Sequence, residues 1–260
     1  MEYRISYWCV SHIGKVRSVN QDNFICDGRY LQPDDEPMDT PLAGTLSSLK
    51  PTLLGVFDGM GGEECGEVAA YIAAKNAAEV KLGAQPLDDL SNYCQTTNDD
   101  ICREIERQGI SSMGTTAAML AFDSEGITLC NIGDSKILRF SKNGPEQISM
   151  DHVAVCPFGK KPPLSQNLGI PPTEMLIDPY FARGIYRDGD YYLICSDGLT
   201  DMVSPESIQK ALYAARNPEA AAQEMLRTAL LNGGKDNITF ILCRIEKVRR
   251  GLGRLFAKKR

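Results

Sequence analysis

Three apolar, β-prone stretches of this chain each adjoin an aspartate with a small or turn-forming neighbour. The three junctions are Leu53–Phe57 before Asp58-Gly59, Tyr191–Cys195 before Ser196-Asp197-Gly198, and Asp236-Asn237 before Ile238–Leu242. An aspartate at a strand end beside glycine is held rigidly and is open on one side, and oxygen ligands for hard divalent cations are commonly mounted in this way. Because these acids lie far apart in the sequence, they predict a metal centre that the fold assembles.

The length and composition are those of an ordinary globular protein. At 260 residues, with 24% charged and 43% hydrophobic residues, the chain can form one large domain or two small ones. No apolar run approaches the ~20 residues that a membrane-spanning helix needs. The first residues, Met1–Ser6, lack the basic-then-apolar layout of a secretion signal. These features predict a cytoplasmic protein.

The cysteines indicate neither a disulfide framework nor a zinc site. There are nine of them, scattered along the chain with no Cys-x-x-Cys pair, and the histidines are His12 and His152. Buried free thiols in a reducing compartment are the preferred interpretation.

The charge is distributed unevenly. The net charge of −6 argues against a general nucleic-acid binder. Residues 247–260 carry seven basic residues and no acid, which leaves 21 basic against 34 acidic residues, or −13, for the rest. We therefore divide the chain into a domain at 1–245 and a basic tail at 246–260. Leu252, Leu255 and Phe256 fall near one helical face of that tail, which favours contact with an anionic membrane or an acidic partner; a solvated, disordered tail is the alternative.

Periodicity and turn chemistry predict a layered arrangement of strands and helices. The expected strands are 3–11 with 23–30 as its partner, 115–122, 127–132, 136–140, 190–195 and 238–244; the expected helices are 64–82, 88–108, 205–215 and 218–231. Residues 32–51 and 156–172 are expected to be loops, and 123–126 and 133–135 to be hairpin turns. Antiparallel strand blocks separated by helix pairs imply an α+β fold with sheets inside and helices outside.

Six motifs occur in a fixed order along nearly the whole chain. They are Arg17-x-x-Asn20-Gln21-Asp22, Asp58-Gly59-Met60-Gly61-Gly62, Gly114-Thr115-Thr116, Gly133-Asp134-Ser135, Ser196-Asp197-Gly198 and Asp236-Asn237-Ile238-Thr239. Each is weak alone. In this order the set resembles the PP2C (PPM) family of metal-dependent protein serine/threonine phosphatases, in its bacterial form.

The resemblance implies a fold, an activity and a set of site residues. The implied fold is a four-layer α-β-β-α sandwich of two antiparallel sheets flanked by helix pairs. The implied activity is hydrolysis of phosphoserine and phosphothreonine by a water that bridges two Mn²⁺ or Mg²⁺ ions. Asp58 would bridge the ions, the Gly59 carbonyl would add a ligand, and Asp22, Asp197 and Asp236 would complete the two ions.

Two further roles follow from the same resemblance. Arg17 would bind the substrate phosphate through its planar fork. Asp134, with Asp197, would hold a weaker third ion. The partners implied are phosphorylated proteins, including a bacterial Ser/Thr kinase that the enzyme opposes, and we expect a monomer, peripheral at the membrane only through its tail.

The chain departs from the family pattern at three places. Gln21 stands where many members have glutamate, which removes one negative charge beside the second ion. Met60 stands where eukaryotic members carry a histidine proposed as general acid. The flap between His152 and the Leu164–Gly169 stretch has only 11 residues, so we expect a shortened flap and a more open metal centre.

Several alternatives stay open at this point. Arg17 could be a surface ion-pair partner, Asp134 could simply cap a hairpin, and His152 is expected to bond backbone and is not counted as catalytic. At the level of the whole protein, the rivals are a pseudophosphatase that keeps the fold without turnover, and another two-metal hydrolase such as a nuclease or a small-molecule phosphatase.

Overall fold

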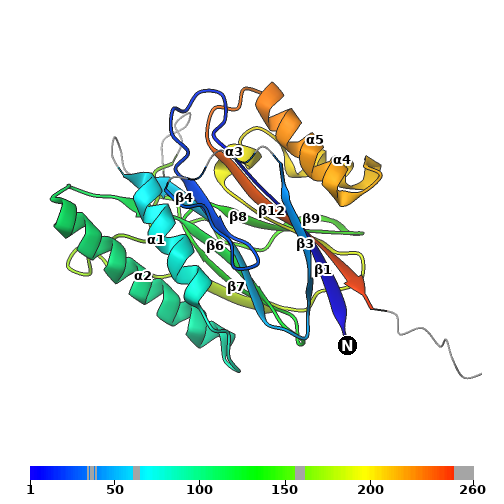
Figure 1. The fold of residues 1–260 in the computed structure, drawn as a ribbon, viewed down its shortest axis with the longest axis horizontal. Coiled ribbons are helices and arrows are strands. Elements are labelled where there is room, and N and C mark those ends of the chain that lie inside the picture. The colour runs from blue at the N-terminus through cyan, green and yellow to red at the C-terminus, as the bar shows by residue number, and fades with distance from the viewer. Residues whose placement is uncertain (34, 36–37, 39, 61–64, 156–161, 249–260) are drawn as a thin grey trace, which may run out of the picture.

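The computed structural model describes residues 1–33, 35, 38, 40–60, 65–155 and 162–248. Within them the chain forms two antiparallel sheets that pack face to face (Figure 1). The first sheet has the order β3 (Leu42–Ser47), β1 (Tyr3–His12), β12 (Ile238–Lys247), β11 (Tyr191–Cys195), β8 (Lys136–Ser141) and β9 (Gly144–Gln147). The second has the order β10 (Tyr180–Gly184), β7 (Ile127–Ile132), β6 (Ala117–Phe122), β4 (Thr52–Met60) and β2 (Asp22–Ile25), with the short β5 (Gly114–Thr115) paired to β4.

Helices cover the outer face of each sheet. Helices α1 (Gly66–Glu79) and α2 (Pro86–Gln108) lie on the second sheet, whereas α3 (Asp197–Thr200), α4 (Pro205–Ala214) and α5 (Pro218–Leu231) lie on the first (Figure 1). The result is the predicted four-layer α-β-β-α sandwich. Among the described helices, none combines the length and the apolar character that a membrane span requires.

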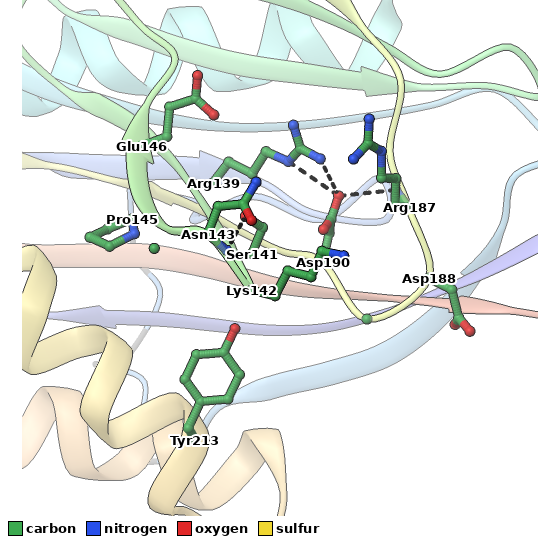
Figure 2. Close-up of a pocket in the computed structure, with 12 residues that line it drawn as sticks. Arg139, Ser141, Lys142, Asn143, Pro145, Glu146, Arg187, Asp188, Asp190 and Tyr213 are labelled. Carbon is green, nitrogen blue, oxygen red and sulfur yellow. Dashed lines mark hydrogen bonds and ion pairs between the residues drawn. The ribbon is translucent and has the colours of Figure 1, made fainter.

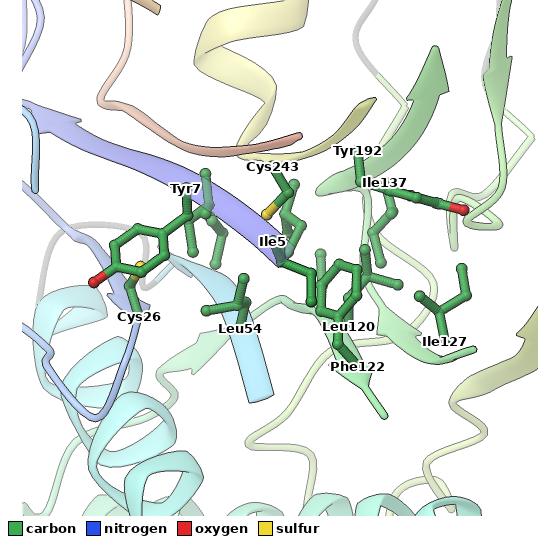
Figure 3. Packing of buried hydrophobic residues seen from close by; sticks show 14 of the residues in the cluster. Ile5, Tyr7, Cys26, Leu54, Leu120, Phe122, Ile127, Ile137, Tyr192 and Cys243 are labelled. Atoms are coloured by element: carbon green, nitrogen blue, oxygen red, sulfur yellow. The ribbon is translucent and has the colours of Figure 1, made fainter. Parts of the chain in front are cut away.

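The central core lies between the two sheets. Its buried side chains come from both inner faces and include Ile5 of β1, Leu54 of β4, Phe122 of β6 and Tyr192 of β11 (Figure 3). Alternation along the strands explains this, because successive side chains of a strand point to opposite faces. The outward neighbours, such as Leu193, pack under the helices instead. Both faces of the central strands are therefore buried, which holds the strand ends rigid.

The helices begin and pack as their sequences dictate. Helix α1 meets the second sheet through small side chains, Ala69, Ala70, Ala73, Ala74 and Ala77, all of which are buried. Small residues allow the helix to approach the sheet closely. Helices α4 and α5 each start with proline after a capping residue: the Ser204 hydroxyl accepts from Ser207 N, and the Asn217 Oδ1 accepts from Ala220 N at 2.8 Å.

Two expectations about strands were wrong, and two strands were not anticipated. Residues 42–47 lie in the predicted loop but form β3, because Leu42 and Leu46 pack into the core at the edge of β1. The stretch after Asn23 does not pair with Tyr3–Ser11, since β2 pairs with β4 in the second sheet while β1 pairs with β3 and β12. Strands β9 and β10 were not anticipated at all.

The turn at Gly133-Asp134-Ser135 is not a hairpin. It joins β7 in the second sheet to β8 in the first, so the chain crosses between the layers here. Gly133 has φ of 98°, and a Cβ at that residue would lie 2.5 Å from the Thr116 methyl carbon. Glycine is required by both the left-handed conformation and the close approach. Asp134 therefore stands at a crossing between the sheets.

Candidate active site

Six of the seven predicted site residues line one pocket at an end of the sandwich. The pocket has a volume of about 280 Å³, and its lining includes Arg17, Asp58, Gly59, Asp134, Asp197 and Asp236. They come from the β1–β2 loop, the end of β4, the β7–β8 crossing, the start of α3 and the loop before β12. The fold thus gathers the acids that the sequence places far apart.

Asp22 lies beside this pocket, opposite Asp58 in the antiparallel pairing of β2 with β4. Asp22 is 4% exposed and lines an adjoining hollow of about 580 Å³. The Ser196 hydroxyl donates to Asp22 Oδ2 at 2.8 Å, whereas Oδ1 has no hydrogen-bond partner among the described residues. A buried carboxylate oxygen without a partner is costly unless a cation or a proton satisfies it.

The backbone of Asp58 is fixed by the Gly114-Thr115-Thr116 motif. Asp58 N donates to Thr116 Oγ1 at 3.0 Å, and the Asp58 carbonyl accepts from Thr115 Oγ1 and from Thr116 N. The two threonines thereby hold the strand end that carries the acid, and Thr116 in turn contacts Ser135 through its hydroxyl at 2.6 Å. We infer that this motif is structural support for Asp58.

Burial and mutual repulsion both disfavour ionised acids here. Burial raises the pKa of Asp58 well above its usual value, and the carboxylates of Asp22, Asp197, Asp134 and Asp236 raise it further. Burial also raises the pKa of Asp22, with hydrogen bonds from Ser196 and Thr239 opposing the shift. The pocket is therefore short of positive charge, which a divalent cation would supply.

Among the described residues that line the pocket, Arg17 is the one with a positive side chain. Its guanidinium donates to Asp236 Oδ2 at 2.8 Å, and this contact raises the pKa of Arg17. About half of the Arg17 side chain stays exposed. Arg17 is therefore an ion-pair partner, as one of the alternatives proposed. The same pair holds the guanidinium beside the acids of the pocket.

Asn237 joins the loop that carries Arg17 to the loop that carries Asp236. Its Oδ1 accepts from Gln21 N at 2.9 Å, and its Nδ2 donates to the carbonyls of Ile13 and Val19. Gly14, with φ of 85°, lies so close that a Cβ there would be 2.3 Å from the Asp236 carbonyl oxygen. Asn237 belongs to one of the six motifs, but this role could not be predicted from the motif because the partners of Asn237 lie more than 200 residues away.

The donor set suits a hard divalent cation. Every acid that lines the pocket offers carboxylate oxygens, and Gly59 can add a backbone carbonyl. No three described His, Cys, Asp or Glu side chains already converge as a closed ligand cluster. Asp22 is turned toward Ser196 and Asp236 toward Arg17. The oxygen chemistry, the unpartnered Asp22 Oδ1 and the repulsion among the acids nevertheless fit Mn²⁺ or Mg²⁺ and not zinc.

Other sequence expectations are resolved or lie outside the described residues. The eight described cysteines are free thiols, as predicted. His152 contacts the backbone of Gly133, its N donating to the Gly133 carbonyl at 3.0 Å. Met60 is partly exposed at the end of β4. Residues 156–161 of the shortened flap, and the tail from residue 249 on, lie outside the described residues.

A second hollow, of about 710 Å³, lies at the opposite end of β8 and β11 (Figure 2). Its lining carries three bases and three acids, among which the Asp190 Oδ2 accepts from Arg139 Nη2 at 2.7 Å and from Arg187 N at 3.0 Å. Since the Asp190 side chain is 6% exposed, this ion pair ties the β10–β11 loop to the sheet. We assign it a structural role.

Comparison with known proteins agrees with this geometry. A family model described as "Protein phosphatase 2C" matches residues 34–157. The serine/threonine protein phosphatase PstP of Mycobacterium tuberculosis is 31% identical over 206 residues, which is 73% of this chain but 40% of that protein's length. The serine/threonine phosphatase stp of Listeria monocytogenes is 24% identical over 257 residues, covering 92% of this chain and 95% of that one.

A solved structure shares the fold over most of the chain. The catalytic domain of the serine/threonine protein phosphatase PstP, in complex with two manganese ions, superposes with a TM-score of 0.75 at 27% identity, over 94% of this chain and 100% of that one. These matches and the shared fold show that the chain belongs to the protein phosphatase 2C family.

Proposed function

We propose that this chain is a metal-dependent protein phosphatase that hydrolyses phosphoserine and phosphothreonine. The observation that carries the proposal is the pocket in which Arg17 stands beside Asp58, Asp134, Asp197 and Asp236. An arginine fork binds a phosphate dianion, while grouped carboxylates bind the cations that neutralise it. The family relationship supports the same activity, since the curated relatives are named serine/threonine phosphatases.

Each residue of the site would have a role that follows from its position. Asp58, Asp197 and Asp236, with the Gly59 carbonyl, would hold one or both ions, Asp22 would support the second, and Asp134 with Asp197 would hold a weaker third. Two bound divalent ions supply charge neutralisation and an activated water. The chain itself orients the reaction: Thr115 and Thr116 fix Asp58, and Asn237 fixes the loop that presents Arg17.

Arg17 has a second task before substrate binds. Its guanidinium neutralises part of the charge on Asp236. A phosphate monoester arriving at the pocket mouth offers Arg17 a more highly charged partner, so the guanidinium would shift its hydrogen bonds to the phosphate oxygens. Arg17 would then hold the phosphate at the acidic pocket.

The rival classes have less support. A pseudophosphatase is disfavoured because Asp22, Asp58, Asp197 and Asp236 are all present and three of them line one pocket. A nuclease needs a basic track for the phosphate backbone, whereas this chain has a net charge of −6 and an acidic site.

The domain limits and partners are part of the proposal. We place the catalytic domain at residues 1–245 and a separate basic tail at 246–260, although β12 itself continues to Lys247. Phosphorylated proteins would be the substrates, with a Ser/Thr kinase among them.

The membrane role of the tail can be tested by removing residues 248–260, the part of the tail that lies beyond β12. The deletion should weaken binding to vesicles that contain anionic lipid and leave peptide turnover unchanged. Equal vesicle binding by the full chain and the shortened chain would refute the tail's membrane role.

The decisive experiment measures phosphate release from a phosphothreonine peptide. We expect release with Mn²⁺, none with EDTA, and recovery when Mn²⁺ is returned. Asp58→Asn should abolish release, while Asp188→Asn, the same change at the far end of the molecule, should match the wild type because Asn keeps the acceptor for Lys247 N. A phosphodiester substrate in parallel tests the nuclease alternative. No metal-dependent release by the wild type would overturn the proposal.

A further inference from the structure

Gln21 stands at the wall of the active-site pocket with its amide orientation fixed by a neighbour. Its Nε2 donates to Glu67 Oε2 at 3.0 Å. A carboxylate only accepts hydrogen bonds, so the NH₂ group of the amide must face Glu67. The amide oxygen Oε1 is therefore presented away from Glu67, on a side chain that lines the pocket with Asp58 and Gly59.

The start of α1 is packed tightly against Gln21 and Gly59. A Cβ at Gly66 would lie 2.9 Å from Gln21 Nε2 and 2.9 Å from the Gly59 carbonyl carbon. A Cβ at Gly59 would lie 2.2 Å from the Gly66 carbonyl oxygen. Gly59 N also donates to the Gln21 carbonyl at 3.1 Å. Gln21, Gly59 and the first turn of α1, which carries Glu67, thus form one packed unit.

This unit can support a bound cation from behind the atoms that would face it. Gln21 supplies a neutral oxygen, and Glu67 supplies a negative charge one hydrogen bond further out. A carboxylate that accepts from the amide increases the electron density on the amide oxygen and prevents the amide from flipping its NH₂ group toward the cation side. The negative charge that Gln21 lacks is therefore present in the pair.

We propose that Glu67 is a positioning residue for the second metal ion, acting through Gln21. The inference rests on the proposed metal centre and adds a residue from α1 to it. Glu67 touches neither substrate nor ion in this arrangement; it sets which end of the Gln21 amide the ion's ligand sphere meets.

Glu67 also lies in the first turn of α1, where an acid stabilises a helix through the helix dipole. That purely structural role predicts a different result on substitution: the metal-free protein would lose stability, and metal affinity would stay the same. The two roles are therefore separable by measuring both quantities.

The test is Mn²⁺ binding by titration calorimetry, with the melting temperature of the metal-free protein as the second readout. Glu67→Gln should weaken the weaker of two Mn²⁺ binding steps about tenfold, the effect typical of removing a support behind a metal ligand. Glu79→Gln, the same change at the exposed end of the same helix, is the matched control and should leave both steps within twofold of the wild type. Equal binding by both variants would overturn the proposal.

A charge swap provides the second test. In the variant Gln21→Glu with Glu67→Gln, the amide and the carboxylate exchange places and the hydrogen bond between them is kept with its direction reversed. We expect the weaker Mn²⁺ step to return to within threefold of the wild type or to become tighter. A swap variant as weak as Glu67→Gln would refute the coupling. If the wild type binds no Mn²⁺, the proposed function and this inference both fail, whereas normal wild-type binding with an unaffected Glu67→Gln removes the inference alone.

Discussion

Asp22 and Asp58 stand opposite each other on paired strands, and both are held with a pKa above the usual range. Adjacent strands bring opposed side chains within about 5 Å, so two carboxylates at this register repel each other unless a proton or a cation intervenes. The Ser196 hydroxyl donates a hydrogen bond to only one carboxylate oxygen of Asp22, Oδ2. The burial and repulsion of these two acids therefore lower the stability of the metal-free protein.

The first prediction concerns the pH dependence of stability without metal. Burial raises the pKa of Asp22 to about 7, above the value of ~3.9 in an unfolded chain. Between these two values the folded protein binds a proton that the unfolded chain has released, so the free energy of unfolding falls as the pH rises. In EDTA, the melting temperature should be higher at about pH 5.5 than at about pH 7.5.

Saturating Mn²⁺ should flatten or reverse that trend, because metal binding requires deprotonated carboxylates. Asp22→Asn should reduce the slope in EDTA. A metal-free melting temperature that rises with pH over this range would contradict the assignment of raised pKa values to these acids.

The second prediction concerns Gly198, which follows Asp197 in α3. A Cβ there would lie 1.9 Å from the Asn237 carbonyl oxygen, a backbone atom that cannot rotate away. Gly198→Ala should force the start of α3, which carries Asp197, away from the loop that carries Asp236, costing about 2 kcal/mol and weakening Mn²⁺ binding. Gly83→Ala is the control, since its Cβ would meet only Asp89 Oδ2 at 3.5 Å. Equal melting temperatures for the two variants would refute this account.

The third prediction separates stability from function. Arg139 and Asp190 form an ion pair at the end of the sandwich away from the active site (Figure 2). Asp190→Ala leaves the Arg139 charge largely buried without its partner and should destabilise the protein by about 3 kcal/mol in denaturant unfolding. Mn²⁺ affinity should not change. A loss of Mn²⁺ binding in a variant that is still folded would show that the two ends of the molecule are coupled.

Local pattern and motif order could be read from the sequence; pairings over long distances could not. Helix α2 was expected from the spacing of Leu90, Tyr93 and Ile101, and these residues are indeed its buried stripe. The pocket acids were grouped correctly because their motifs occur in the family's order. Strand β3 was missed because its signal, an edge pairing with β1, lies in another part of the chain.

The supports of the site were missed for the same reason. Ser196 lies 174 residues from its partner Asp22, and Glu67 lies 46 residues from Gln21. A serine or a glutamate carries no local sign that it will serve a distant acid or amide. The glycine at residue 133 was likewise interpreted as a hairpin glycine, although its conformation serves a crossing between sheets.

The last prediction concerns Arg17, whose guanidinium pairs with Asp236 in the structure. Arg17→Ala removes the phosphate partner and also frees Asp236 from a competing cation. Turnover of a phosphothreonine peptide should therefore fall, with kcat/KM lower by about 100-fold, while Mn²⁺ affinity stays equal to the wild type or becomes tighter. Arg17→Lys should recover part of the loss, because an ammonium keeps the charge without the planar fork. If Arg17→Ala instead weakened Mn²⁺ binding and left kcat/KM at saturating Mn²⁺ unchanged, Arg17 would be a support for Asp236 and not a phosphate-binding residue.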